Sequence, residues 1–95
     1  MGYKLTSEAK NDLTEIYIYG YEKFGETQAE KYFSELEDCF QIISKTPLIS
    51  RERTEFTPHV RIHHHGRHLV IYVTQDTQIL IVRILHDSMD IQQHL

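Results

Sequence analysis

Two strongly apolar runs flank one short polar segment in residues 69–86. The runs are Leu69–Val73 and Ile79–Leu85, and Thr74–Gln78 separates them. This order predicts an antiparallel hairpin with a loop of about four residues, because the Asn-Gly or Asp-Gly pair of a tight turn is missing. Both runs are apolar at nearly every position, so both faces of the hairpin need cover. We expect helices of the chain to cover one face, and a tail or a second molecule to cover the other.

The length and composition predict a single domain spanning residues 1–95. The lone cysteine, Cys39, has no partner for an internal disulfide, which favours a reducing compartment and a place in or beside the core. No apolar stretch is long enough for a membrane-spanning helix, and the first residues lack the apolar region of a signal peptide. We therefore expect a cytoplasmic protein without a membrane partner.

Charge is distributed unevenly along the chain. All five lysines fall within residues 1–47, whereas all five arginines and all seven histidines follow. With a net charge of −4 and a pI of about 5.9, the chain is unsuited to non-specific binding of nucleic acid, and no direct sequence-specific binding is expected. Arginine and histidine in the second half are the residue types that bind planar anions or carry protons.

Two helices are predicted ahead of the hairpin. Thr6 or Ser7 caps the first helix, whose apolar stripe ends at Gly25. Thr27, with Glu30 three residues on, forms a capping box for the second helix. The link between the helices is so short that they must pack as an antiparallel pair.

Shorter elements complete the predicted order β-α-α-β-β-β. Tyr3–Leu5 reads as an edge strand, Pro47 ends the second helix, residues 48–58 form a polar connector, and Val60–His65 alternate as a further strand. We predict an α+β fold in which a two-helix antiparallel hairpin packs on a small antiparallel sheet.

A short C-terminal turn or helix is expected after the last strand. Asp87 or Ser88 would cap it, and Met89 and Ile91 would then lie against the sheet. A tail of this length is expected to cover only part of the second face.

Arg83 interrupts an otherwise apolar strand. An unpaired charge buried there would be costly, so Arg83 needs a carboxylate partner or an exposed position. Asp87 and Asp90 are the candidates for an internal ion pair, and a direct contact to a ligand is the alternative. The opposite face carries Arg61, Tyr72 and Arg83 if the residues that face the helices are Val60, Ile62, Leu69, Ile71, Val73, Leu80, Val82 and Ile84.

The histidines suggest two further kinds of chemistry. His63 and His65 point to one side of their strand and could share a metal with His68, but no carboxylate or thiol is close in sequence. We interpret them as polar positions and expect no metal and no cofactor. His86, at the exit of the last strand, could act as a general acid or base or serve as a hydrogen-bonded structural residue.

The segment Arg83–Asp90, RILHDSMD, resembles the signature that closes ParE toxins of the RelE/ParE superfamily. Further similarity lies in Leu5–Ala9 with Asp12-Leu13, in Phe24-Gly25 with Gln28-Ala29, and in Arg61, His68 and Tyr72. The resemblance covers essentially the whole chain, and the C-terminal octapeptide is its most specific part.

This resemblance implies a bacterial toxin of a type II toxin-antitoxin system, of the kind associated with plasmid stabilisation. It implies inhibition of DNA gyrase by protein-protein contact, without catalysis by this chain, and neutralisation by a ParD-like antitoxin in a hetero-oligomer. The expected contacts with the target are Arg83, His86, Met89 and Asp90. The expected contacts with the antitoxin are Tyr72, Ile79, Ile81 and Leu85, the residues that would otherwise leave the hairpin uncovered.

The alternative is a RelE- or YoeB-like ribosome-dependent mRNA endonuclease, in which Arg61, Arg83, His86 and Glu55 would be catalytic. Three features disfavour it. The sheet face lacks the lysine cluster of RelE, the pI is too low for docking into ribosomal RNA, and the chain ends in Met89-Asp90 instead of the tyrosine of those enzymes. An inactive relative that only binds antitoxin is a further alternative.

Overall fold

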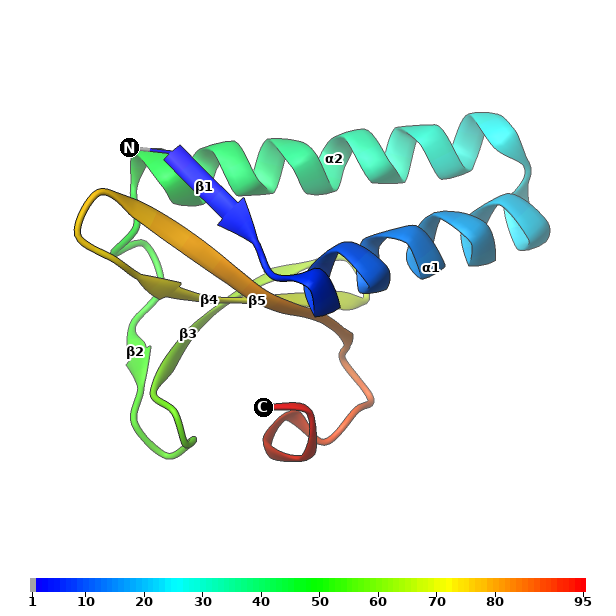
Figure 1. The fold of residues 1–95 in the computed structure, drawn as a ribbon. Helices are drawn as coiled ribbons and strands as arrows, with labels where there is room; N and C mark the ends of the chain where they lie inside the picture. Colours follow the sequence, from blue (N-terminus) through cyan, green and yellow to red (C-terminus); the bar gives the residue numbers. More distant parts are fainter. Residues whose placement is uncertain (1) are drawn as a thin grey trace.

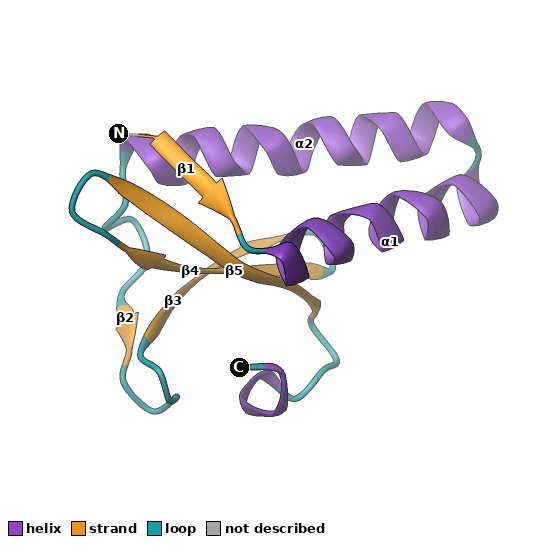
Figure 2. Cartoon of the chain, in the orientation of Figure 1, coloured by secondary structure: helices purple, strands orange, loops and turns teal. Residues whose placement is uncertain are grey.

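The computed structural model describes residues 2–95, in which two helices lie on one face of a sheet and the C-terminal segment curls under the other (Figure 1). Helix α2 and its partner α1 run side by side, and their junction projects beyond the strands (Figure 2). The elements are β1 (Gly2–Leu5), α1 (Ser7–Phe24), α2 (Glu26–Lys45), β2 (Glu52–Arg53), β3 (Val60–His65), β4 (His68–Thr74), β5 (Gln78–His86) and the 3-10 helix η1 (Ile91–His94). The predicted α+β fold is confirmed.

The sheet has the order β1-β5-β4-β3-β2. Strands β3, β4 and β5 pair antiparallel, as predicted, and β2 adds a further antiparallel pair with β3. β1 pairs parallel with β5, so the sheet is mixed. Strand β2 was predicted as part of a connector. It has only two residues, which is too short for a periodic pattern in the sequence.

The start of α1 agrees with the prediction, whereas the start of α2 does not. The Thr6 side chain caps α1 by accepting a hydrogen bond of 3.0 Å from the Ala9 N–H. Gly25, at φ 88°, both ends α1 and precedes α2. The predicted capping box of Thr27 and Glu30 is therefore wrong, because a one-residue junction starts α2 at Glu26.

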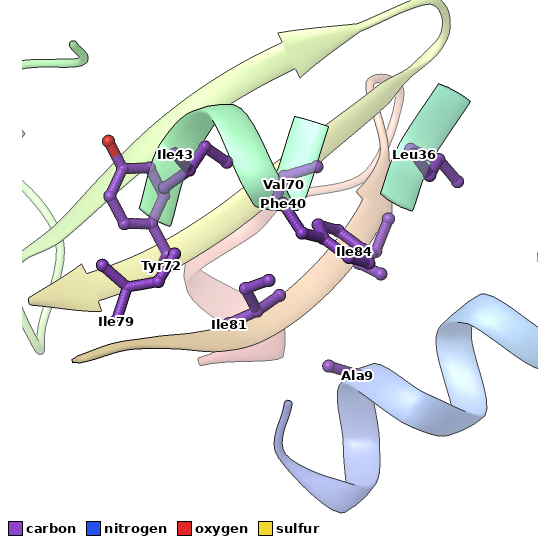
Figure 3. Packing of buried hydrophobic residues seen from close by; sticks show 9 residues of the cluster. All are labelled: Ala9, Leu36, Phe40, Ile43, Val70, Tyr72, Ile79, Ile81 and Ile84. Atoms are coloured by element: carbon purple, nitrogen blue, oxygen red, sulfur yellow. The ribbon is translucent and has the colours of Figure 1, made fainter. Parts of the chain in front are cut away.

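The helix-facing core is built from both helices and the two central strands (Figure 3). Its buried residues are Ala9, Leu36, Phe40, Ile43, Val70, Tyr72, Ile79, Ile81 and Ile84. Tyr72, Ile79 and Ile81 therefore face the helices, and their predicted place on the opposite face is wrong. The Tyr72 hydroxyl, buried with its ring, donates a hydrogen bond of 2.9 Å to the Pro47 carbonyl. Cys39 is buried as expected.

A β-bulge explains part of this error. Ile71 pairs with Arg83 but Tyr72 pairs with Ile81, so β5 carries one extra residue at this point. An extra residue moves the following side chains to the other face, which is why Ile81 and Ile84 both face the helices. In β4 every position from Leu69 to Val73 is apolar, so no alternation in the sequence distinguished its two faces.

The opposite face of the sheet has its own small core of Val60, Ile71 and Leu85. Phe56 and the C-terminal residues Ile91 and Leu95 pack against it, so the second face is covered within residues 2–95. The tail covers only part of this face, as expected, because Phe56 shares the cover and Ile62, Leu69 and Val73 remain partly exposed. Asp90 instead of Asp87 or Ser88 caps η1, and Met89 points to solvent with 45% of its surface exposed.

Candidate functional site

Helix α1 completes the edge of β5 where β1 ends. β1 pairs with β5 only as far as Leu5 and Ile81. Beyond that point the Thr6 hydroxyl donates to the Val82 carbonyl at 2.7 Å, and the Asp12 carboxylate accepts from the Ile84 N–H at 3.0 Å. Side chains of α1 thus take the place of a neighbouring strand and fix the path of the RILHDSMD signature.

Arg83 and Asp12 form a bidentate ion pair. The Arg83 Nε and Nη2 atoms donate to the two Asp12 carboxylate oxygens at 2.8 and 2.9 Å, and Nη1 donates to the His94 carbonyl at 3.3 Å. The side chains are only 21% and 12% exposed, and the hydrogen bonds to Asp12 raise the pKa of Arg83. The predicted internal ion pair exists, but its partner is Asp12 and not Asp87 or Asp90. Asp12 lies 71 residues away, so no local pattern identified it.

The second half of the signature forms one wall of an open groove of about 770 Å³. His86, Ser88 and Met89 lie on this wall, and both helices contribute the other. The helical lining is mainly apolar or aromatic, and its members include Ile16, Tyr17, Tyr19, Gly20, Phe24, Ala29, Tyr32 and Phe33. Tyr19 and Phe24 are 60% and 68% exposed, which leaves a large apolar surface without cover in this chain.

A cluster of aromatic and titratable side chains closes the groove beside β4. The His68 Nδ1 atom and the Tyr32 hydroxyl are hydrogen-bonded at 2.6 Å, and the His68 and His86 rings meet edge to face at 5.6 Å. Gly66 permits this packing, because it has φ 56° and a Cβ there would lie 2.8 Å from the Tyr32 hydroxyl. The His86 Nδ1 atom is in turn 2.7 Å from the Ser88 hydroxyl.

Burial, and after it the neighbouring His86, lower the pKa of His68 below its usual value of about 6.5. As the pH falls below that value, His68 therefore takes up a proton in the unfolded chain before it does so in the folded chain. The contribution of His68 to stability is fully present above pH 6.5 and is lost as the pH falls.

We predict that the melting temperature falls between pH 7.5 and pH 5.5, and that His68→Gln makes this fall smaller. His63, whose pKa burial also lowers, contributes in the same direction. The exposed His59→Gln variant serves as the control and should keep the full fall. An undiminished fall in His68→Gln would contradict the assignment.

The residues required for the nuclease alternative are dispersed. Arg61 donates to the Ser50 carbonyl at 2.7 Å, and Glu55 pairs with Arg53 at 2.7 Å. His86 lies at the other end of the sheet, because it pairs with His68 while Arg61 pairs with Tyr72. His68 and Tyr72 are four residues apart along β4, a distance of roughly 13 Å. The structure does not bring these residues together around one reacting group.

His65 of β3 and His68 of β4 both pack against the Tyr32 ring but have different side-chain partners. The His65 Nε2 atom lies 3.1 Å from the Glu35 carboxylate of α2, whereas the His68 Nδ1 atom is bonded to the Tyr32 hydroxyl. Within residues 2–95 no group of three or more histidine, cysteine or acidic side chains is placed to hold a metal ion. The same residues include no helix with the length and apolar character needed to span a membrane.

A two-helix hairpin on a small mixed sheet, with a C-terminal signature beside an open groove, defines the fold class of the chain. The fold is similar to a solved chain described as the chromosomal ParDE TA system from P. aeruginosa. The TM-score is 0.77 at 22% identity, over 90% of this chain and 95% of that one.

The sequence comparisons identify the family. The family model described as ParE toxin of type II toxin-antitoxin system, parDE, matches residues 3–91. Toxin ParE1 of Mycobacterium tuberculosis is 35% identical over 98% of this chain and 96% of the relative. Toxin ParE1 of Caulobacter vibrioides is 31% identical over the same shares. The chain therefore belongs to the ParE toxin family, as the C-terminal signature predicted, and an antitoxin is its partner.

Proposed function

We propose that this ParE-family toxin inhibits DNA gyrase by direct protein-protein contact and that a ParD-like antitoxin neutralises it. One observation carries the proposal. The RILHDSMD signature is divided between a part-buried anchor at Arg83 and a turn at His86–Asp90 that is exposed from Asp87 onward, so the turn is presented on a fixed support. Such a contact requires no proton transfer by this chain, in agreement with the dispersal of the nuclease candidates.

The roles of the candidate target contacts differ. Met89 is 45% exposed and Asp90 is exposed, so both are available to a target protein, and His86 lies beside them on the rim of the groove. The guanidinium of Arg83 is occupied by Asp12 and the His94 carbonyl. We assign Arg83 the role of holding the turn in place.

The groove is the surface that we assign to the antitoxin. An amphipathic helix that lays its apolar face into such a groove is a common mode of recognition. The residues first expected to bind antitoxin do not fit this role, because Tyr72, Ile79, Ile81 and Leu85 are buried within the chain. Tyr19, Phe24 and Tyr32 offer the apolar surface that those residues lack.

Neutralisation follows from overlap between the two surfaces. His86, Ser88 and Met89 line the groove and also belong to the turn proposed to meet gyrase. An antitoxin helix in the groove would cover one side of that turn. Antitoxin and gyrase are therefore expected to compete for the toxin.

Tyr19→Asp is predicted to separate the two activities. A charge on the helical wall should weaken antitoxin binding by about tenfold or more, since it places an unpaired carboxylate in an apolar contact. Toxicity should persist, because Tyr19 lies away from the proposed target contact. Ile18→Asp is the matched control, because Ile18 is 49% exposed but points about 100° away around the helix. Calorimetry with the cognate antitoxin measures the affinity of each variant, and equal losses in Tyr19→Asp and Ile18→Asp would contradict the groove assignment.

Expression in growing cells tests the proposed target. Gyrase inhibition should produce a DNA-damage response and filamentation while translation is initially intact, and co-expressed antitoxin should suppress both. Prompt cleavage of mRNA on translating ribosomes, lost in His86→Ala, would instead assign the nuclease activity to this chain.

A further inference from the structure

The turn proposed to contact the target has few attachments of its own. The Met89 N–H donates to the His86 carbonyl at 3.0 Å, and the Asp87 N–H donates to the Arg67 carbonyl at 2.9 Å. Both bonds lie before Asp90, and the Asp90 carboxylate accepts a bond of 3.2 Å from the Gln92 N–H, which belongs to the same segment. The position of Asp90, and with it the direction of the chain after Met89, therefore depends on how the chain is held further on.

Gln92 holds the chain on that far side. Its Oε1 atom accepts from the Thr57 N–H at 3.0 Å, and its Nε2 atom donates to the Thr57 carbonyl at 2.9 Å. One side-chain amide thus pairs with both backbone groups of a residue in the loop between β2 and β3, as a neighbouring strand would. The amide of asparagine or glutamine presents an acceptor and a donor side by side, as a backbone peptide group does, and glutamine has the longer reach.

The remaining contacts of the tail are different in kind. Ile91 and Leu95 pack on the second core, which is an adaptable and non-directional contact. Arg83 reaches the His94 carbonyl at 3.3 Å, a longer bond than either bond of Gln92. The pair between Gln92 and Thr57 is therefore the contact that fixes the direction of the chain directly after Asp90.

We propose that Gln92 is a positioning residue for target recognition. It latches the C-terminal segment to the loop at Thr57 and so holds Met89 and Asp90 in the arrangement that the target meets. The turn is then fixed at both ends, by Arg83 with Asp12 before it and by Gln92 with Thr57 after it. This inference rests on the proposed function in one respect, namely that the turn at residues 86–90 makes the target contact.

Gln92→Ala in the full chain tests the latch, with Gln93→Ala as the matched control because Gln93 is its exposed neighbour in η1. Gln92→Glu is the second variant, since it keeps the shape and the acceptor but removes the donor. Each is compared with the wild type for growth inhibition at matched protein level, for inhibition of DNA supercoiling by gyrase, and for melting temperature.

The expected result is a loss of potency of about tenfold for Gln92→Ala, because binding must then order the turn. Gln92→Glu should also lose potency. The bonds of Gln92 are exposed, so the melting temperature should change little, and Gln93→Ala should match the wild type.

Full potency in Gln92→Ala would overturn the proposal. So would a loss of potency that only parallels a loss of folded protein, which would make Gln92 a structural residue. If the wild type inhibits growth but leaves gyrase active, the proposed target is wrong, and growth inhibition still decides the role of Gln92. If the wild type is not toxic at all, both the proposed function and the role of Gln92 are overturned.

Discussion

Asp12→Ala is expected to lower the free energy of unfolding by about 2–4 kcal/mol, between the values for exposed and for fully buried ion pairs, because the pair with Arg83 is only partly buried. The Asp12 carboxylate accepts two hydrogen bonds from Arg83 and a third from the Ile84 N–H. Its loss leaves a guanidinium and a backbone donor without their acceptor in a site that is only 12–21% exposed. Chemical denaturation monitored by circular dichroism measures the change.

Two variants sharpen this prediction. Asp12→Asn retains an oxygen for Arg83 or Ile84 but loses the charge, so its effect should be smaller than that of Asp12→Ala. Glu22→Ala, at an exposed position of the same helix, should change stability by less than about 0.5 kcal/mol. A loss below 1 kcal/mol in Asp12→Ala would class the pair with ordinary surface salt bridges.

The Arg83→Ala variant tests whether Arg83 supports the turn or touches the target directly. If Arg83 supports the turn, the variant should lose stability and toxicity together. A variant that keeps its melting temperature and its affinity for antitoxin, yet loses toxicity, would show that the guanidinium itself touches the target.

Met89→Glu is expected to weaken inhibition of gyrase by about 30-fold, which corresponds to the loss of one interface hot spot of roughly 2 kcal/mol. The fold should be unaffected because the side chain is 45% exposed. Antitoxin binding should weaken as well, since Met89 also lines the groove. This combined loss contrasts with Tyr19→Asp, which should escape neutralisation and remain toxic.

Leu48→Glu is the control for Met89→Glu. Leu48 is an exposed apolar residue that follows α2, away from the groove, so its replacement makes the same chemical change elsewhere. Equal potency of the two variants in the supercoiling assay would contradict a contact at Met89.

The sequence alone predicted the two helices, the apolar hairpin and the family. Helix periodicity, the cap at Thr6, the stop at Gly25 and the apolar hairpin are local signals, and each acts over a few residues. The need of Arg83 for a carboxylate also followed from elementary electrostatics. The identity of that carboxylate did not, because Asp12 reaches β5 only after α1 has packed beside it.

The faces of the hairpin and the groove depend on tertiary structure. Tyr72, Ile79 and Ile81 were assigned to the wrong face because a strand that is apolar throughout has no alternation to read, and because the bulge in β5 reverses the phase. The groove lies between the helix pair and the turn at His86–Met89, which are far apart in the sequence. Gln92 gave no signal at all, since its partner Thr57 lies 35 residues earlier in an irregular loop.

Inhibition of purified DNA gyrase is the most direct test of the proposed function. Increasing amounts of the purified chain should stop negative supercoiling of relaxed plasmid DNA. The cognate antitoxin should restore supercoiling when added at one molecule per toxin. Gyrase that remains fully active at every toxin concentration, while the same preparation cleaves mRNA in a translation reaction, would contradict the proposal.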